Sequence, residues 1–137
     1  MARNAPAGLM RFLLDSSILI AIGLATGLAT GDAVRRRLAE LNEGDAVTSV
    51  IAYAEVLHGS RQGKAPPEDH LALIIEEVEV LPFDRAAASV YAGLSFKRAS
   101  YDRLIAAHAL SLGLTLVTAN IADFADVPGL VVEEWSR

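Results

Sequence analysis

The chain has 137 residues and no cysteine, so it fits one ordinary domain with a buried core and has neither disulfides nor thiolate metal ligands. Hydrophobic residues make up 53% of it, which excludes a disordered composition. The formal net charge of −5 argues against a protein that coats nucleic acid by charge alone. A nuclease stays compatible with that charge, because metal-binding carboxylates count as negative until the metal binds. The absence of cysteine suits a cytoplasmic location, which we expect.

The N-terminal part divides into two segments. Residues 1–9 show no periodicity, and we expect a flexible extension there, followed by a single domain over 10–137. The apolar run after Arg11 has some features of a signal peptide or a membrane span, but an acid and two serines at 15–17 interrupt it. Because a carboxylate inside a membrane is costly, we expect no membrane association.

Hydrophobic periodicity predicts alternating strands and helices along the chain. Strands are expected at 11–15, 45–49, 78–83, 114–120 and 129–135. Helices are expected at 16–24, 31–44, 49–59, 66–79, 85–98 and 101–113. The expected N-caps, in chain order, are a serine for the first helix and then Asp32, Ser49, Asp84 and Ser100. Gly44 and Gly113 are expected to mark the ends of two helices.

Short strands that alternate with helices predict one α/β domain with a mostly parallel central sheet, covered by helices on both faces. The chain contains no internal repeat, low-complexity tract or interdomain linker. In open α/β sheets, functional groups collect at the carboxyl ends of the strands. The expected elements bring four acids toward that edge: Asp15, Glu55, Asp102 and Asp123.

Carboxylates without nearby cysteine suit hard divalent cations such as Mg²⁺ or Mn²⁺, which take oxygen ligands and bridge to phosphate oxygens. A metal held in this way can polarise a phosphodiester and generate hydroxide from bound water. The spacing alone is a weak signal, because the chain has 17 acidic residues from which to choose four.

Three segments, MRFLLDSSILIA, TSVIAYAEVLHG and YDRLIAAHALSLGLTLVTANIADFADVPGLVVEEW, carry a more specific signal. From residue 10 to residue 135 they resemble, in order, a PIN domain of the VapC-type toxin ribonucleases. The resemblance implies a PIN-like fold and a metal-dependent endoribonuclease that uses Mg²⁺ or Mn²⁺. It also implies a homodimer within a larger toxin–antitoxin complex, inhibited by a cognate VapB-type antitoxin.

The resemblance assigns roles to individual residues. Asp15, Glu55 and Asp102 match the central metal-binding acids, and Asp123 matches a fourth, more variable acid for which Asn120 is the alternative. Ser17 and Thr118 match polar residues that support the site. One departure is the segment YAGLSFKRASYD before the third acid, which is shorter than in relatives and lets the helix after Asp84 end early.

Each candidate also has a purely structural interpretation. Asp15 could cap a helix, Glu55 could lie on a solvated helix face, Asp102 could be a favourable first-turn charge and Asp123 could be a solvated loop acid. Among the histidines, His58 shares a helix face with Glu55 and is expected to be structural or to line a groove. His108 is expected to pack in the core, and His70 to be exposed.

Basic residues offer a second set of candidates. The default interpretation of the run at 35–37 is a solvated helix face, and the alternative is contact with an RNA backbone. The same alternative applies to the cations that flank Asp102. The candidates for backbone contact are Arg35, Arg36, Arg37, Lys97, Arg98 and Arg103.

Two other classes of function are compatible with one α/β domain that carries acids at its strand ends. A receiver-like phosphoacceptor domain would need a lysine after a late strand, and neither Lys64 nor Lys97 is placed for it. A catalytically inactive protein-binding module would have no use for four acids. Sequence does not distinguish transfer, ribosomal and messenger RNA as substrates, because all present phosphodiesters.

Overall fold

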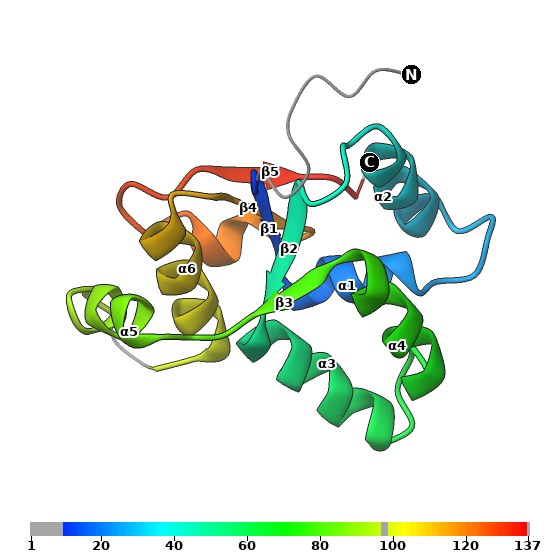
Figure 1. Cartoon of the computed structure of the whole chain (residues 1–137), viewed down its shortest axis with the longest axis horizontal. Helices are drawn as coiled ribbons and strands as arrows, with labels where there is room; N and C mark the ends of the chain where they lie inside the picture. The colour runs from blue at the N-terminus through cyan, green and yellow to red at the C-terminus, as the bar shows by residue number, and fades with distance from the viewer. Residues whose placement is uncertain (1–9, 97–98, 137) are drawn as a thin grey trace.

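The computed structural model describes residues 10–96 and 99–136, which form a three-layer α/β domain (Figure 1). The strands are β1 (Phe12–Leu14), β2 (Ala46–Ser49), β3 (Glu79–Leu81), β4 (Thr115–Thr118) and β5 (Val132–Glu134). The helices are α1 (Ser16–Ile22), α2 (Ala29–Ala39), α3 (Val50–Arg61), α4 (Glu68–Glu77), α5 (Arg85–Ala92) and α6 (Tyr101–Leu112), with a 3-10 turn η1 (Ile121–Phe124) after β4. The expected extension at 1–9 lies outside the described residues.

All neighbouring strands pair in parallel, in the order β3-β2-β1-β4-β5. The chain first adds strands on one side of β1 and then crosses to add β4 and β5 on the other side. Because parallel crossovers are right-handed, this reversal places α1–α4 on one face of the sheet and α5 and α6 on the other, as Figure 1 shows. The α/β class, the parallel sheet and the helices on both faces are therefore confirmed.

The strand order also bears on the receiver-like alternative. Receiver domains have the flavodoxin-like order 2-1-3-4-5, which places the first and third strands side by side. Here β1 lies between β2 and β4, and β3 is an edge strand. The receiver-like interpretation is therefore wrong.

The core is centred on the middle strands, whose side chains are covered on both faces. Leu13, Leu14 and Val47 are fully buried, whereas the edge strand β3 is only partly covered. Near the C-terminus, the Trp135 ring packs edge-on against Phe12 with 5.1 Å between ring centroids. This contact joins the two ends of the described chain across the sheet.

Two expected helix starts differ from the structure. The cap of α1 is Asp15 rather than a serine, because its carboxylate accepts a hydrogen bond from the backbone N–H of Ile18. Helix α2 begins two residues before the expected start, so Asp32 lies in its first turn instead of capping it. The Asp32 carboxylate instead accepts from the N–H of Gly27 and pairs with Arg35, which fixes the loop before the helix.

Helix ends follow the expectations in part. Helix α2 stops at Ala39, before Gly44, whose φ of 86° turns the chain directly into β2. Helix α5 stops at Ala92, so the expectation of a helix to residue 98 is wrong and the early end is confirmed. Gly113 closes α6 in the left-handed conformation, as expected, and Ser49, Asp84 and Ser100 cap their helices.

Among residues 10–96 and 99–136, no helix combines the length and the apolar character needed to cross a bilayer. The apolar run of the N-terminal part is divided between β1 and the seven-residue helix α1.

Candidate functional site

The site is built at the point where the sheet reverses its direction of growth, between β1 and β4. Asp15 directly follows β1, and its N–H donates to the carbonyl of Val117 in β4, 3.0 Å away. Its side chain is buried, with 4% of the residue exposed. Crevices at such reversals are where open α/β sheets bind ligands. Asp15 thus caps α1, as its purely structural interpretation predicts, and it also lies at the expected site.

A hydrogen-bond network fixes the Asp15 carboxylate. The hydroxyl of Ser17 donates to Oδ1 of Asp15 at 2.5 Å and accepts from the N–H of Ala119 at 2.9 Å. Ser17 Oγ also lies 3.4 Å from Oγ1 of Thr118, which accepts from the N–H of Asn120 at 3.0 Å. The two residues expected to support the site therefore join the start of α1 to the end of β4.

Glu55 approaches from α3, which starts at the carboxyl end of β2. Ser49 caps this helix by accepting from the N–H of Ile51, which sets the direction of the first turn. Glu55 lies in the second turn and is half-buried. Its Oε1 is buried and has no hydrogen-bond partner among the described residues. An orphaned buried carboxylate oxygen is costly, so it marks a position where a further ligand would stabilise the fold.

Asp102 and Asp123 complete the group from the other side of the sheet. Asp102 lies in the first turn of α6, which Ser100 caps, and it is half-buried. Asp123 is exposed in η1, and its charge raises the pKa of Asp102. Asn120 precedes η1 and is exposed. Asp123 is thus electrostatically linked to Asp102, whereas Asn120 carries no charge.

Burial is the largest cause that raises the pKa of Asp15, of Glu55 and of Asp102. Mutual repulsion adds to it, because the charge of Asp102 raises the pKa of both Asp15 and Glu55. Hydrogen bonds from Ser17 to Asp15 and from Ser16 to Glu55 act in the opposite direction. Asp15, Glu55 and Asp102 therefore share one electrostatic environment, to which Asp123 contributes through its effect on Asp102.

The donor set of this site fits a hard divalent cation, because it consists of carboxylate and hydroxyl oxygens and includes the orphaned Oε1 of Glu55. The side chains of the described residues are nevertheless spread apart. Within that part of the chain, no three His, Asp or Glu side chains converge as ligands of one ion do.

The histidines lie outside this group. His58 and His70 are exposed, as expected for His70. His108 is buried in α6, as expected, with Nδ1 2.7 Å from Oγ of Ser49 and its ring edge-on to Phe83. Burial lowers its pKa, and a hydrogen bond to the backbone of Pro82 opposes that shift. His108 therefore joins α6 to the N-cap of α3 and to the segment after β3.

Three of the six basic candidates bind partners within the chain. Arg35 donates to the carbonyls of Ile22 and Leu24, and Arg37 contacts Glu133 and lies over the Trp135 ring. Arg103 makes a two-pronged pair with Asp126. Of the others, Arg36 is exposed, while Lys97 and Arg98 lie outside the described residues. Figure 1 shows α2 well apart from the starts of α3 and α6.

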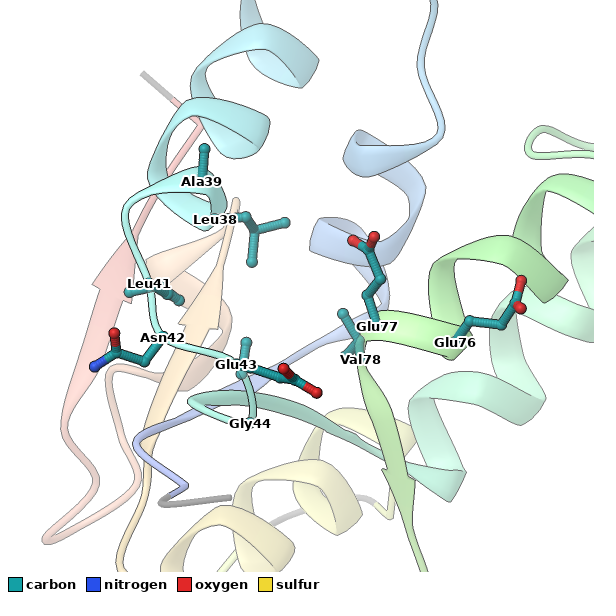
Figure 2. A pocket seen from close by; sticks show the side chains of 10 residues that line it. Leu38, Ala39, Leu41, Asn42, Glu43, Gly44, Glu76, Glu77 and Val78 are labelled. Carbon is teal, nitrogen blue, oxygen red and sulfur yellow. The ribbon is translucent and has the colours of Figure 1, made fainter. Parts of the chain in front are cut away.

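A hollow of about 480 Å³ lies at the opposite, amino-terminal edge of the sheet (Figure 2). Leu38 at the end of α2, Glu43 in the loop before β2, and Glu76, Glu77 and Val78 at the end of α4 line it. None of the four site acids lines this hollow.

Comparisons with known proteins agree with this geometry. The PIN-domain family model matches residues 12–130. The tRNA(fMet)-specific endonuclease VapC of Shigella flexneri is 33% identical over 138 residues, covering 93% of this chain and 100% of that protein. The chain belongs to the PIN-domain family, and within it to the VapC branch. Dependence on a divalent metal is general among PIN nucleases.

Solved structures show the same relationship. DNA-bound VapBC from Salmonella typhimurium has a TM-score of 0.73 and 29% identity, covering 93% of this chain and 99% of the other. VapBC-5 from Mycobacterium tuberculosis, a member of the VapBC family of toxin–antitoxin systems, has a TM-score of 0.60 and 28% identity, covering 96% and 100%. The similarity thus extends over nearly the whole chain.

Sequence reasoning missed two residues beside the acids. Ser16 hydrogen-bonds to Glu55, and the only signal for it is its place as the serine directly after Asp15. Asp126 pairs with Arg103 across 23 positions of sequence. No local pattern indicates that pairing, because it depends on how η1 lies against α6.

The raised pKa of buried Asp15 predicts a pH-dependent effect of the substitution Asp15→Asn on stability. A carboxyl whose pKa is raised in the folded state costs stability above that pKa, and the cost disappears as the pH falls below the value in the unfolded chain. In metal-free buffer, we expect Asp15→Asn to raise the free energy of unfolding at pH 8 by about 1 kcal/mol, the usual scale of one substitution. The gain should vanish near pH 3.5. Urea unfolding with EDTA at both pH values measures it, and an equal gain at both would contradict the burial argument.

Proposed function

We propose that this chain is the toxin of a toxin–antitoxin pair, a metal-dependent endoribonuclease that hydrolyses RNA phosphodiester bonds in the cytoplasm. The observation that carries the proposal is the position of buried Asp15 at the β1/β4 reversal, together with the electrostatic coupling of Asp102 to Asp15 and Glu55. Asp123 adds to this coupling, because its charge raises the pKa of Asp102. The similarity to an endonuclease over 93% of the chain supports the same conclusion.

Mg²⁺ or Mn²⁺ is the proposed cofactor, held by the four acids. When bound, such an ion polarises a phosphodiester and activates a water molecule. The chain's own contribution is to keep the ligands in place before the ion arrives. Ser17 and Thr118 hold Asp15 against rotation, Asn120 joins this network through its N–H, and Ser16 orients Glu55. Glu55 on α3 and Asp102 on α6 would supply further oxygen ligands to such an ion.

The phosphate backbone of RNA is a poor fit to this edge without a cation, because four clustered carboxylates repel it. The metal requirement therefore follows from the charge of the site as well as from its donors. Arg36 is the exposed candidate for a distant backbone contact, together with Lys97 and Arg98 on the segment before Asp102. Transfer RNA is the first substrate to test, since the Shigella flexneri relative is named for tRNA(fMet).

A catalytically inactive binding module is the less favoured interpretation. Burying Asp15 beside other acids and leaving Glu55 Oε1 orphaned both cost stability. Such costs are typical of active sites, where stability is given up for function. A surface used only for binding a protein would not need them.

The proposed partner is a VapB-type antitoxin, and the proposed assembly is a homodimer within a larger complex. Large apolar side chains are exposed on neighbouring elements: Ile20 of α1 is 39% exposed, Leu28 before α2 is 49% exposed and Leu73 of α4 is 64% exposed. Exposed apolar surface of this kind marks protein contacts. The solved VapBC structures support a partner of this type.

The assembly makes one prediction. Sedimentation of the purified chain without antitoxin should show a dimer, because two copies can cover the exposed apolar side chains on α1 and α4. Ile20→Glu combined with Leu73→Glu should shift the protein to monomer, and Leu112→Glu, at an exposed position of α6, is the matched control. A monomer at micromolar concentration in the parent chain would contradict the dimer.

The metal site makes a second prediction. Asp15→Asn and Asp102→Asn should each lower Mn²⁺-dependent RNA cleavage by at least about 100-fold, the upper range for loss of an outer partner of a metal site. The fold should survive, because amide and carboxylate have nearly the same shape. Asp69→Asn is the control, since Asp69 is an exposed first-turn acid on α4. Full cleavage by folded Asp15→Asn protein would overturn the assignment.

Inhibition makes a third prediction. The simplest way to silence clustered carboxylates is to place an antitoxin arginine or lysine where the metal would bind, and the net charge of −5 attracts such a segment. Antitoxin and metal should then compete, with apparent antitoxin affinity falling about tenfold as Mn²⁺ rises to saturation. Calorimetric titration with and without Mn²⁺ measures this. Equal affinity at saturating metal would mean that the antitoxin covers the groove instead.

A further inference from the structure

Arg103 and Asp126 form the best-aligned ion pair near the acids. Nη1 of Arg103 donates to Oδ1 of Asp126 and Nη2 donates to Oδ2, each over 2.7 Å. The Arg103 side chain is 19% exposed and that of Asp126 63% exposed. Two parallel charge-assisted bonds fix orientation as well as distance, which a single contact does not.

The pair joins the two elements that carry the outer acids of the site. Arg103 directly follows Asp102 in the first turn of α6, and Asp126 lies just after η1, which carries Asp123. Ser100 fixes the same turn of α6 by accepting from the N–H of Arg103. The Arg103–Asp126 pair therefore connects the turn that carries Asp102 to the segment that carries Asp123.

The turn that carries Asp123 needs such an external support. It is a four-residue 3-10 segment, and its N-cap Asn120 makes no side-chain cap bond within the described residues. Short 3-10 turns have poor hydrogen-bond geometry and little stability of their own. Phe124 anchors the turn in the core, but this leaves Asp123 on the exposed side. The ion pair restrains that side against α6.

We propose that Arg103 and Asp126 act together as positioning residues that hold Asp123 against Asp102, and that Arg103 is not an RNA contact. This inference rests on the proposed function, because it assigns the pair to the four-acid site. Asp126 occupies the end-on fork of the guanidinium and offsets its positive charge, which leaves only the Nε edge for a phosphate.

A double-mutant cycle tests the proposal. Arg103→Gln, Asp126→Asn and the double variant should each weaken Mn²⁺ binding and lower kcat by about 10–100-fold, the range for groups that orient metal ligands. The double variant should be no worse than either single variant, because each single change already removes the whole pair. KM for RNA should stay within about twofold. Arg103→Lys should restore little, since an ammonium cannot form two parallel bonds.

If Arg103 instead contacts RNA, the variants should show a different pattern of kcat, KM and Mn²⁺ affinity. If Arg103 binds an RNA phosphate, Asp126→Asn frees it, so kcat and Mn²⁺ affinity stay at the parent level and only Arg103→Gln raises KM. That pattern overturns the proposal. Arg61→Gln with Glu68→Gln is the matched control, because Arg61 and Glu68 form an equally forked but exposed pair between α3 and α4.

Asp15→Asn separates this inference from the proposed function. An active Asp15→Asn protein would refute the metal site itself. An inactive Asp15→Asn protein together with a fully active Asp126→Asn protein that binds Mn²⁺ normally would refute the positioning role alone. Circular dichroism and urea unfolding of every variant exclude loss of the fold as the cause.

Discussion

The reversal of sheet growth between β1 and β4 is the constraint on which the rest of the structure depends. Strands added after β1 lie on one side of it, and β4 and β5 lie on the other. The connections must then leave on opposite faces at the carboxyl ends of β1 and β4. Asp15 is at this reversal because it directly follows β1 and its backbone still pairs with Val117. The other candidate acids lie toward the same edge because α3, α6 and η1 also start there.

Holding carboxylates together at this edge costs stability, and the surrounding residues reduce that cost without removing it. Asp15 is almost fully buried, yet its Oδ1 receives both the Ser17 hydroxyl and the N–H of Ile18. Glu55 is less well stabilised, because its Oε1 has no hydrogen-bond partner in the described part of the chain. The pKa of each is raised, so the folded protein resists full ionisation at the site. A divalent cation is the kind of ligand that would relieve this strain.

Three arginines are fixed by partners within the fold. Arg103, beside Asp102, is tied to Asp126, and Arg35, on α2 away from the acids, is tied to the carbonyls of Ile22 and Leu24 and to Asp32. Arg37 is fixed over Trp135 and beside Glu133 at the end of the sheet. Each therefore stabilises the junction of two elements. The four candidate acids keep their negative charge, which would attract either a divalent metal ion or a cationic side chain of the antitoxin.

The sequence by itself determined the five strands and the six helices, because these are local properties of hydrophobic period and capping side chains. It indicated the four candidate acids only through the family resemblance, because their spacing alone is a weak signal. Ser49, Asp84 and Ser100 cap their helices as their spacing indicates. A local signal failed where other nearby partners compete: Asp32 has a cap-like residue type, but it pairs with Gly27 and Arg35 while α2 starts earlier. Only the tertiary structure decided that Asp126 holds Arg103 and that Glu55 Oε1 is orphaned. Those outcomes depend on sheet order and helix packing, which bring together residues that no period or motif relates.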